Sequence, residues 1–167
     1  MRPAYMSLGS NLQPERYLPL ALIALSRLGR VGRVSAAYES EAVGPAGQPR
    51  FCNAAVRLDT EDEADGLRAR LRQIEAQLGR VRTKDKFAPR TIDLDLVAMD
   101  DFVDGEVTQR AYLAVTLAEV APDLPVGPKG ERLAEFAERL RQGVVLRPRS
   151  DVDLQSLVDA PEDRPTP

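Results

Sequence analysis

The chain has 167 residues, which is enough for one domain of ordinary size but not for two. It carries 23 Lys and Arg against 26 Asp and Glu, a formal net charge of −3, and 43% of its residues are hydrophobic, as is typical of globular proteins. It contains no histidine and a single cysteine, Cys52. These counts exclude Ser-His-Asp and Cys-His catalysis, imidazole-ligated metals, cysteine-cluster metal sites and intrachain disulfides. Any chemistry must therefore use carboxylates, Arg, Lys, hydroxyls, backbone groups or a metal held by oxygen.

Apolar periodicity and turn formers predict the elements in chain order. They are strands at 4–8, 31–40, 51–58, 91–97 and 144–147, and helices at 15–28, 61–78, near 116–121 and near 131–142. The clearest is helix 61–78, where apolar residues recur at spacings of three and four and Gly79 follows as a stop signal. The order strand-helix-strand-strand-helix-strand predicts an α+β fold of the ferredoxin-like type, with additional C-terminal helices and three α/β/α layers.

Residues 1–147 are predicted to form a single domain. The tail 148–167 holds two Arg against five Asp and Glu, has few large apolar residues and ends in Pro-Thr-Pro, so we expect it to be disordered. The opening residues lack the apolar core of a secretory signal, and no run of about 18 apolar residues exists anywhere in the chain. With one cysteine, these features predict a cytoplasmic protein without a membrane segment.

A basic segment is the most informative part of the sequence. From Arg68 to Arg90 there are eight basic and two acidic residues, a local charge of +6 on a chain that is acidic overall. Such a concentration is either a solvated helix face with a basic loop, or a site that meets an anion.

An acidic pair follows this segment directly. Asp93 and Asp95 are two positions apart on a predicted strand, so both side chains leave the same face, while Ile92, Leu94 and Leu96 point to the core. Two like charges so placed repel unless a cation lies between them, and oxygen ligands of this kind suit Mg²⁺. The pair could also be the solvated face of an edge strand. Next to the basic loop, it favours a site in which arginines hold a polyphosphate and carboxylates hold metal ions.

Four ordered blocks carry a family resemblance. They are Gly9-Ser10-Asn11-Leu12, Val43-Gly44-Pro45 with Gln48-Pro49 and Phe51-Cys52-Asn53-Ala54-Ala55-Val56, Arg80-Val81-Arg82 with Phe87-Ala88-Pro89-Arg90-Thr91-Ile92-Asp93-Leu94-Asp95-Leu96, and Leu117-Ala118-Glu119-Val120-Ala121-Pro122-Asp123-Leu124. Together they resemble the 6-hydroxymethyl-7,8-dihydropterin pyrophosphokinase family over residues 4–145. The resemblance implies a ferredoxin-like fold and transfer of pyrophosphate from ATP to the pterin hydroxymethyl group, with release of AMP, as a step of folate biosynthesis. It also implies two Mg²⁺ ions and a monomer that acts on small molecules.

The resemblance further implies roles for single residues. Asp93 and Asp95 would bind the metal ions and act in catalysis with Arg80 and Arg90. ATP contacts would come from Glu75, Arg82, Lys86, Arg90, Leu96 and Arg110, and pterin contacts from Ser40, Val43, Phe51, Asn53, Phe87 and Tyr112. A flat heterocycle is recognised by aromatic faces and a placed amide, and Asn offers both a donor and an acceptor. Phe51 and Tyr112 could instead be ordinary core residues.

The chain departs from the family pattern at one segment. Fourteen residues, 96–109, separate Asp95 from Arg110, and they lack the Pro-His pair that family members usually place there in contact with ATP. This shortening leaves open a pterin- or nucleotide-binding protein with a weakened nucleotide site. A single-stranded nucleic-acid binder on a ferredoxin-like sheet is a further alternative, but only 5% of the residues are aromatic and the net charge is negative, so we expect no nucleic-acid partner.

Overall fold

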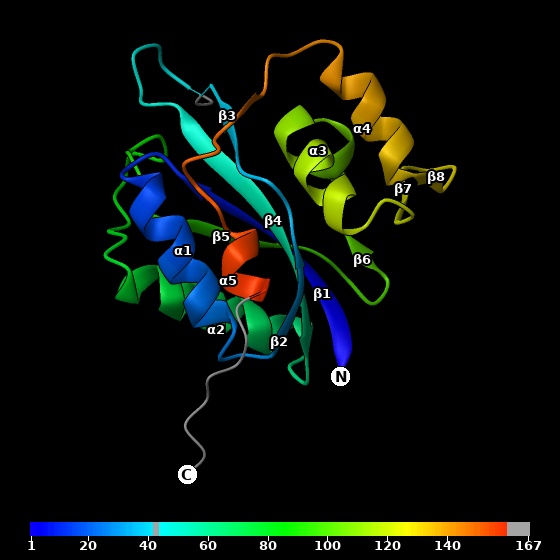
Figure 1. Cartoon of the computed structure of the whole chain (residues 1–167), viewed down its shortest axis with the longest axis horizontal. Helices are drawn as coiled ribbons and strands as arrows, with labels where there is room; N and C mark the ends of the chain where they lie inside the picture. Colours follow the sequence, from blue (N-terminus) through cyan, green and yellow to red (C-terminus); the bar gives the residue numbers. More distant parts are fainter. Residues whose placement is uncertain (42–43, 160–167) are drawn as a thin grey trace.

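The computed structural model describes residues 1–41 and 44–159, and it is a mixed α/β fold built on an antiparallel sheet. Helices cover both faces of this sheet: α1, α2 and α5 lie on one side, and α3 and α4 on the other (Figure 1). Among the described residues, no helix has the length and apolar character needed to cross a membrane.

Three long strands form the centre of the sheet. β1 (Arg2–Ser10) lies between β4 (Phe51–Thr60) and β5 (Asp93–Met99), antiparallel to both. Shorter strands flank this centre: β2 (Arg30–Val34), β3 (Tyr38–Ser40), β6 (Phe102–Val103) and β9 (Arg147–Pro148). The strand order is β6-β5-β1-β4-β3-β9, with β2 also paired to β4. The single strand expected at 31–40 is thus two strands, because the chain leaves the regular ladder at residues 35–37.

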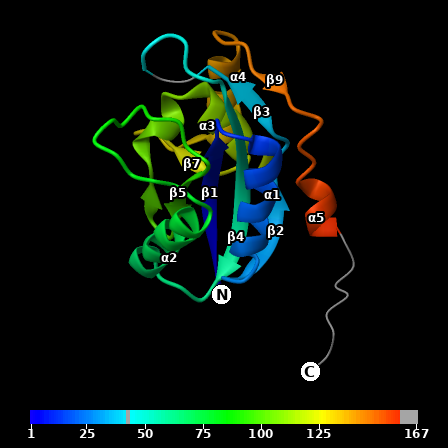
Figure 2. The same ribbon diagram turned by 90° about the vertical axis from the view of Figure 1, so that its left-hand side faces the viewer.

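The first face of the sheet carries the larger core. Helices α1 (Pro14–Leu25) and α2 (Ala64–Gln77) lay their apolar stripes against it, as their periodicity predicts. Figure 2 shows both helices beside the sheet, seen from the side. Ile92, Leu94 and Leu96 are buried, which confirms that these positions point to the core.

The second face is covered by α3 (Ala111–Val120) and α4 (Leu133–Arg141), which pack on each other. Helix α3 begins five residues before the expected position 116, because it is apolar almost all round and has no period to mark its start. It follows a short 3-10 helix, Gly105–Thr108, and a small hairpin of β7 (Pro125–Val126) and β8 (Glu131–Arg132) leads to α4.

The prediction of a disordered tail is wrong for residues 148–159. β9 pairs with β3, the side chains of Val152 and Leu154 are buried in the first core, and α5 (Gln155–Asp159) packs against β2. The prediction relied on the acidic composition of this segment. The segment also contains Val152, Leu154 and Val158, whose apolar side chains pack against the end of this core. Residues 160–167 lie outside the described part of the chain.

Candidate active site

A row of paired residues crosses the sheet and defines the floor of the site. Gly9 on β1 pairs with Asn53 on β4 and with Asp93 on β5, and Tyr38 on β3 pairs with Asn53. Two positions along β1, Ser7 pairs with Asp95. Since side chains alternate along a strand, Asp93 and Asp95 leave the sheet on the same side as Asn53, the side covered by α3.

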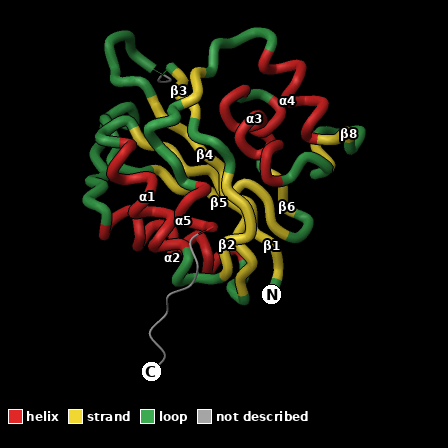
Figure 3. Tube along the Cα trace, in the orientation of Figure 1, coloured by secondary structure: helices red, strands yellow, loops and turns green. Residues whose placement is uncertain are grey.

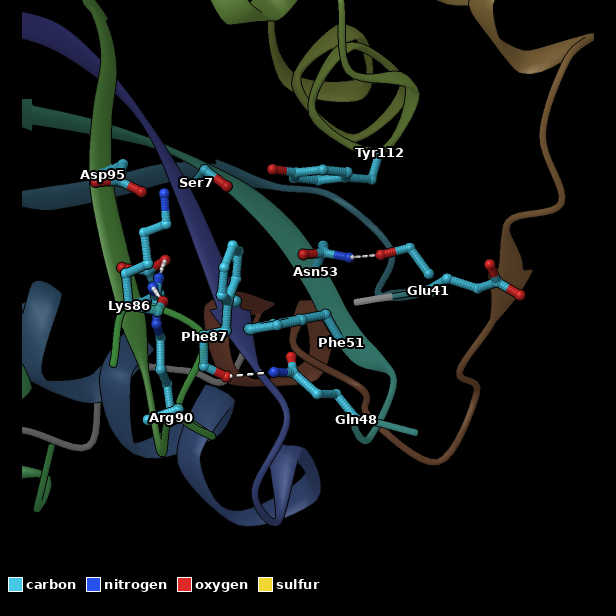
Figure 4. A pocket seen from close by; sticks show the side chains of 14 residues that line it. Ser7, Glu41, Gln48, Phe51, Asn53, Lys86, Phe87, Arg90, Asp95 and Tyr112 are labelled. Atoms are coloured by element: carbon cyan, nitrogen blue, oxygen red, sulfur yellow. Dashed lines mark hydrogen bonds and ion pairs between the residues drawn. The ribbon is translucent and has the colours of Figure 1, made fainter. Parts of the chain in front are cut away.

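A cavity of about 280 Å³ opens on this floor. The ring of Phe51 lies on one side of Asn53, and the ring of Tyr112, from the first turn of α3, lies on the other (Figure 4). The Asn53 Nδ2 atom donates to Ser40 Oγ at 2.8 Å and to the Tyr38 carbonyl oxygen at 3.5 Å. This leaves the side-chain oxygen of Asn53, Oδ1, as an acceptor between two aromatic rings. Such an arrangement suits a flat polar heterocycle.

Two loops meet at the mouth of the cavity, and Figure 3 shows them at the same end of the molecule. Gln48 Nε2 donates to the Phe87 carbonyl oxygen at 2.7 Å, which joins the loop before β4 to the basic loop after α2. Gly44 has φ +122°, and a Cβ atom there would come within 2.5 Å of the Phe87 ring. The Phe87 ring can therefore occupy this position only because residue 44 has no side chain.

The buried carboxylate of Glu75 fixes the start of the basic loop through hydrogen bonds. It is 3% exposed and accepts from Arg80 Nη1 at 2.6 Å, from Arg82 Nη2 at 2.8 Å and from the Leu94 backbone N–H at 2.8 Å. A buried carboxylate is stable only when it is paired in this way. Glu75 thereby ties helix α2, the basic loop and strand β5 together.

Asp93 forms ion pairs with two arginines. Arg80 Nη1 donates to its Oδ1 and Arg90 Nη1 to its Oδ2, both at 2.7 Å. Arg90 is itself held by the Lys86 carbonyl oxygen at 2.6 Å and, through its backbone N–H, by Asn11 Oδ1 at 2.7 Å. The Arg90 guanidinium is therefore positioned at the cavity wall before any ligand enters, and Arg80 fixes Asp93 from behind this wall.

Asp95, in contrast, forms no ion pair with any of the described residues. Its side chain is exposed at the cavity, but neighbouring protein atoms still displace part of its hydration. That desolvation, together with the charges of Asp93 and Glu75, raises the pKa of Asp95 to about 6. Crowded carboxylates whose repulsion a cation would relieve are a donor set that suits Mg²⁺.

A second hollow, of about 370 Å³, begins at the same carboxylate. Asp95 lines both spaces, and the second is also lined by Glu75, Arg82 and Leu96. Arg68 and Phe102 complete this wall, with the guanidinium carbon 4.8 Å from the ring centroid. The shortened segment 96–109 contributes this phenylalanine from the β5–β6 hairpin.

The structure brings most of the predicted residues to these two spaces. Ser40, Phe51, Asn53, Lys86, Phe87, Arg90, Asp93, Asp95 and Tyr112 line the first, and Glu75, Arg82, Asp95 and Leu96 line the second. Arg80 joins Glu75 to Asp93 between them. Arg110 is apart from Arg82: it precedes α3 and lines a third hollow with Arg50 and Arg147. Val43 lies outside the described residues.

Other lining residues were not assigned a role from the sequence. Ser7, Gly9 and Gln48 line the first space, and Arg68, Arg72 and Phe102 the second. Arg68, Arg72 and Glu75 fall at positions i, i+4 and i+7 of α2, so helical spacing could have placed them on one face. A pocket for a flat ring that opens onto arginines and carboxylates is typical of an enzyme that joins a planar substrate to a phosphate-rich one.

Comparison with known proteins agrees with this class. The chain matches the family model of 7,8-dihydro-6-hydroxymethylpterin-pyrophosphokinase over residues 5–122. Similar proteins named 2-amino-4-hydroxy-6-hydroxymethyldihydropteridine pyrophosphokinase include one from Pseudomonas aeruginosa, 38% identical over 79% of this chain and 88% of its own length. One from Methylorubrum extorquens is 38% identical over 84% and 94%, and one from Bacillus subtilis is 32% identical over 90% and 93%. The chain belongs to the 7,8-dihydro-6-hydroxymethylpterin-pyrophosphokinase family.

Solved structures share the fold. A crystal structure of Plasmodium falciparum HPPK-DHPS superposes on 83% of this chain with a TM-score of 0.65, at 12% sequence identity. This chain spans 43% of the length of that protein. At this identity, the likeness concerns the fold alone.

Proposed function

We propose that this protein transfers the terminal diphosphate of ATP to the hydroxymethyl group of 6-hydroxymethyl-7,8-dihydropterin, releasing AMP. One observation carries the proposal: Asp95 lines both the aromatic pocket around Asn53 and the hollow that contains Arg82 and Glu75. Two ligands bound in these spaces would meet at one carboxylate. Family membership supplies the identity of the two ligands.

The pterin would lie between Phe51 and Tyr112. Its ring N–H groups would donate to the side-chain oxygen of Asn53, Oδ1. The bonds from Asn53 Nδ2 to Ser40 and Tyr38 leave this acceptor free. Asp95 and Arg90 line the other side of the cavity, and the hydroxymethyl group would have to face them for transfer to occur. Positioning of this kind supplies much of the rate in phosphoryl-type transfer.

The triphosphate would meet the arginines of the basic loop. Arg82, whose side chain is 61% exposed, and Lys86 and Arg90 are placed to contact it, and Arg80 would hold Asp93 in register. In the transfer, the hydroxymethyl oxygen forms a bond to the β-phosphorus and gives up its proton to solvent. The bond from that phosphorus to the α–β bridging oxygen breaks, and AMP leaves with this oxygen. Fixed guanidinium groups stabilise the charge that develops on the phosphate oxygens.

Asp93 and Asp95 would hold Mg²⁺, and we propose two ions. When bound, the metal neutralises phosphate charge and aligns the phosphate oxygens for in-line displacement. Two carboxylates leave the rest of each coordination shell to phosphate oxygens and water, as Mg²⁺ prefers. The raised pKa of Asp95 supports this role, because a cation would favour its ionised form.

We also propose that the strands β1 to β5 with α1 and α2 form a ferredoxin-like core, to which α3 and α4 add a third layer. The strand order β5-β1-β4-β3, with antiparallel neighbours throughout, supports this description. A monomer acting in the cytoplasm is proposed as well, in keeping with a single, buried cysteine.

The test is release of AMP and of the pterin diphosphate by the purified protein with ATP, Mg²⁺ and the dihydropterin. We expect Asp95→Asn to lower the rate at least about a hundredfold. The control Asp123→Asn, on the exposed turn after α3, should leave the rate unchanged. A wild-type protein that binds both ligands without forming AMP would contradict the proposal and favour a binding protein with a weakened nucleotide site.

A further inference from the structure

The interruption between β2 and β3 is held by side chains and backbone groups from other elements. At Ser35, the backbone N–H donates to the Ala55 carbonyl oxygen, and the hydroxyl accepts from the Ala55 N–H. The Ala37 carbonyl oxygen accepts from the Arg149 N–H. The Ala36 N–H donates to a carboxylate of α3, that of Glu119, at 2.8 Å. The path of the chain into β3 thus depends on contacts from outside the β2–β3 segment.

Glu119 makes a second bond beyond the interruption. Its Oε2 atom accepts from Ala36, and its Oε1 atom accepts from the Tyr38 hydroxyl. Burial and the Glu119 carboxylate raise the pKa of Tyr38, so the hydroxyl stays a donor. Glu119 lies in the last turn of α3, where the helix dipole disfavours a negative charge. Its position there is explained by its bonds to Ala36 and Tyr38 rather than by helix stability.

Strand β3 in turn holds the amide of Asn53. It is three residues long, which defines its register only weakly. Tyr38 pairs with Asn53 across the ladder, and the Tyr38 carbonyl oxygen and Ser40 Oγ accept from Asn53 Nδ2. A Cβ atom on Gly9 would lie 3.4 Å from Asn53 Oδ1, which places this oxygen over β1 at the cavity floor. A shift of β3 would therefore rotate the amide and remove the acceptor from the pocket.

We infer that Glu119 is a positioning residue for the pterin pocket, acting through Tyr38 and strand β3 on the amide of Asn53. The inference rests on the proposed function, because it takes the dihydropterin as the ligand of that amide. Glu119 touches neither of the two spaces that would hold substrate. It belongs to the fourth sequence block, Leu117–Leu124, to which the proposed reaction assigns no other task.

The first measurement needs no ligand. The side-chain amide signals of Asn53 in ¹H–¹⁵N spectra should shift in Glu119→Gln and in Tyr38→Phe. They should stay in place in Glu138→Gln, which changes an exposed glutamate of α4. Because Glu119 is solvent-exposed, the glutamine variant is expected to fold, and Tyr38→Phe breaks the same bond from the other side. Unmoved Asn53 signals in both variants would overturn the inference.

The second measurement is calorimetric binding of 6-hydroxymethyl-7,8-dihydropterin. Loss of this charge-assisted bond should weaken pterin binding about fivefold in Glu119→Gln. The KM for ATP should stay unchanged, a split that general destabilisation would not produce. The double variant with Tyr38→Phe should bind no more weakly than the single ones. Additive losses, or equal losses for both substrates, would overturn the inference, whereas a wild-type protein that binds no pterin would contradict the proposed function instead.

Discussion

The Nη1 atom of Arg80 lies 2.7 Å from Oδ1 of Asp93, and these two residues are thirteen positions apart in the sequence. The same nitrogen is 2.6 Å from Oε1 of Glu75, so one guanidinium joins a helix to the strand that carries the acidic pair. Arg80 is 10% exposed and Glu75 3% exposed. The bonds that hold the site in shape are therefore shielded from solvent and from screening by salt.

Glu75→Ala should destabilise the fold by about 3 kcal/mol, because it removes one of the two carboxylates that pair with Arg80 and leaves the buried Leu94 N–H without its acceptor. Urea unfolding followed by circular dichroism measures this. Glu138→Ala, at an exposed site on α4, is the control and should change the free energy of unfolding by less than about 0.5 kcal/mol. Equal stability of the two variants would show that the Glu75 network contributes nothing to folding.

Asp95→Asn should not destabilise the protein, although it should lower the rate at least about a hundredfold. The pKa of Asp95 is raised from 3.8 to about 6 in the fold, so the folded state holds the ionised form less well than the unfolded state does. The contribution of Asp95 to the free energy of unfolding should accordingly decline as pH rises from about 4 to about 6, and stay level above that range. The asparagine variant should lack this decline. Parallel pH–stability curves, measured by urea unfolding without Mg²⁺, would contradict the prediction.

Gly44→Ala should weaken pterin binding at least about tenfold, because the new Cβ atom would displace the Phe87 ring from the mouth of the pocket. Gly47→Ala is a matched control in the same loop. It also has positive φ, at +87°, but no atom lies within 4 Å of its Cβ position. Calorimetric titration with the dihydropterin should separate the two variants, and equal affinities would mean that Phe87 does not depend on Gly44.

Cys52 should be inert in the native protein. Its side chain is fully buried in β4, and burial raises the pKa of the thiol to about 11, so the nucleophilic thiolate is scarce at neutral pH. Ellman's reagent should label the thiol only after urea unfolds the chain. Rapid labelling without denaturant would show that β4 opens locally.

Leu154→Ala should destabilise the protein by about 3 kcal/mol, because this side chain is 2% exposed and fills the first core. Leu157→Ala, three residues later at 42% exposure, should cost less than about 1 kcal/mol. Urea unfolding compares the two. Similar losses in both variants would mean that the segment 148–159 does not dock as the structure places it.

Local patterns predicted the elements with a strong period. Helix α2 and the inward side of β5 follow from spacings of 3.6 and 2, and the two aspartates share a face for the same reason. The early start of α3 did not follow, because a helix buried on most of its surface has no polar face to set its phase. The roles assigned to the site residues by resemblance remain predictions.

By itself, the sequence determined which side chains could do chemistry: with no histidine, the carboxylates and arginines around residues 75–95 were the available groups, and four ordered blocks indicated the family. Only the tertiary structure decided how these groups combine. The register of β1 sets Asn53 and Asp93 on either side of Gly9, and the path of the chain separates Arg110 from Arg82. The physical reason is that periodicity reports the faces of one element, whereas a site is made by contacts between elements distant in sequence.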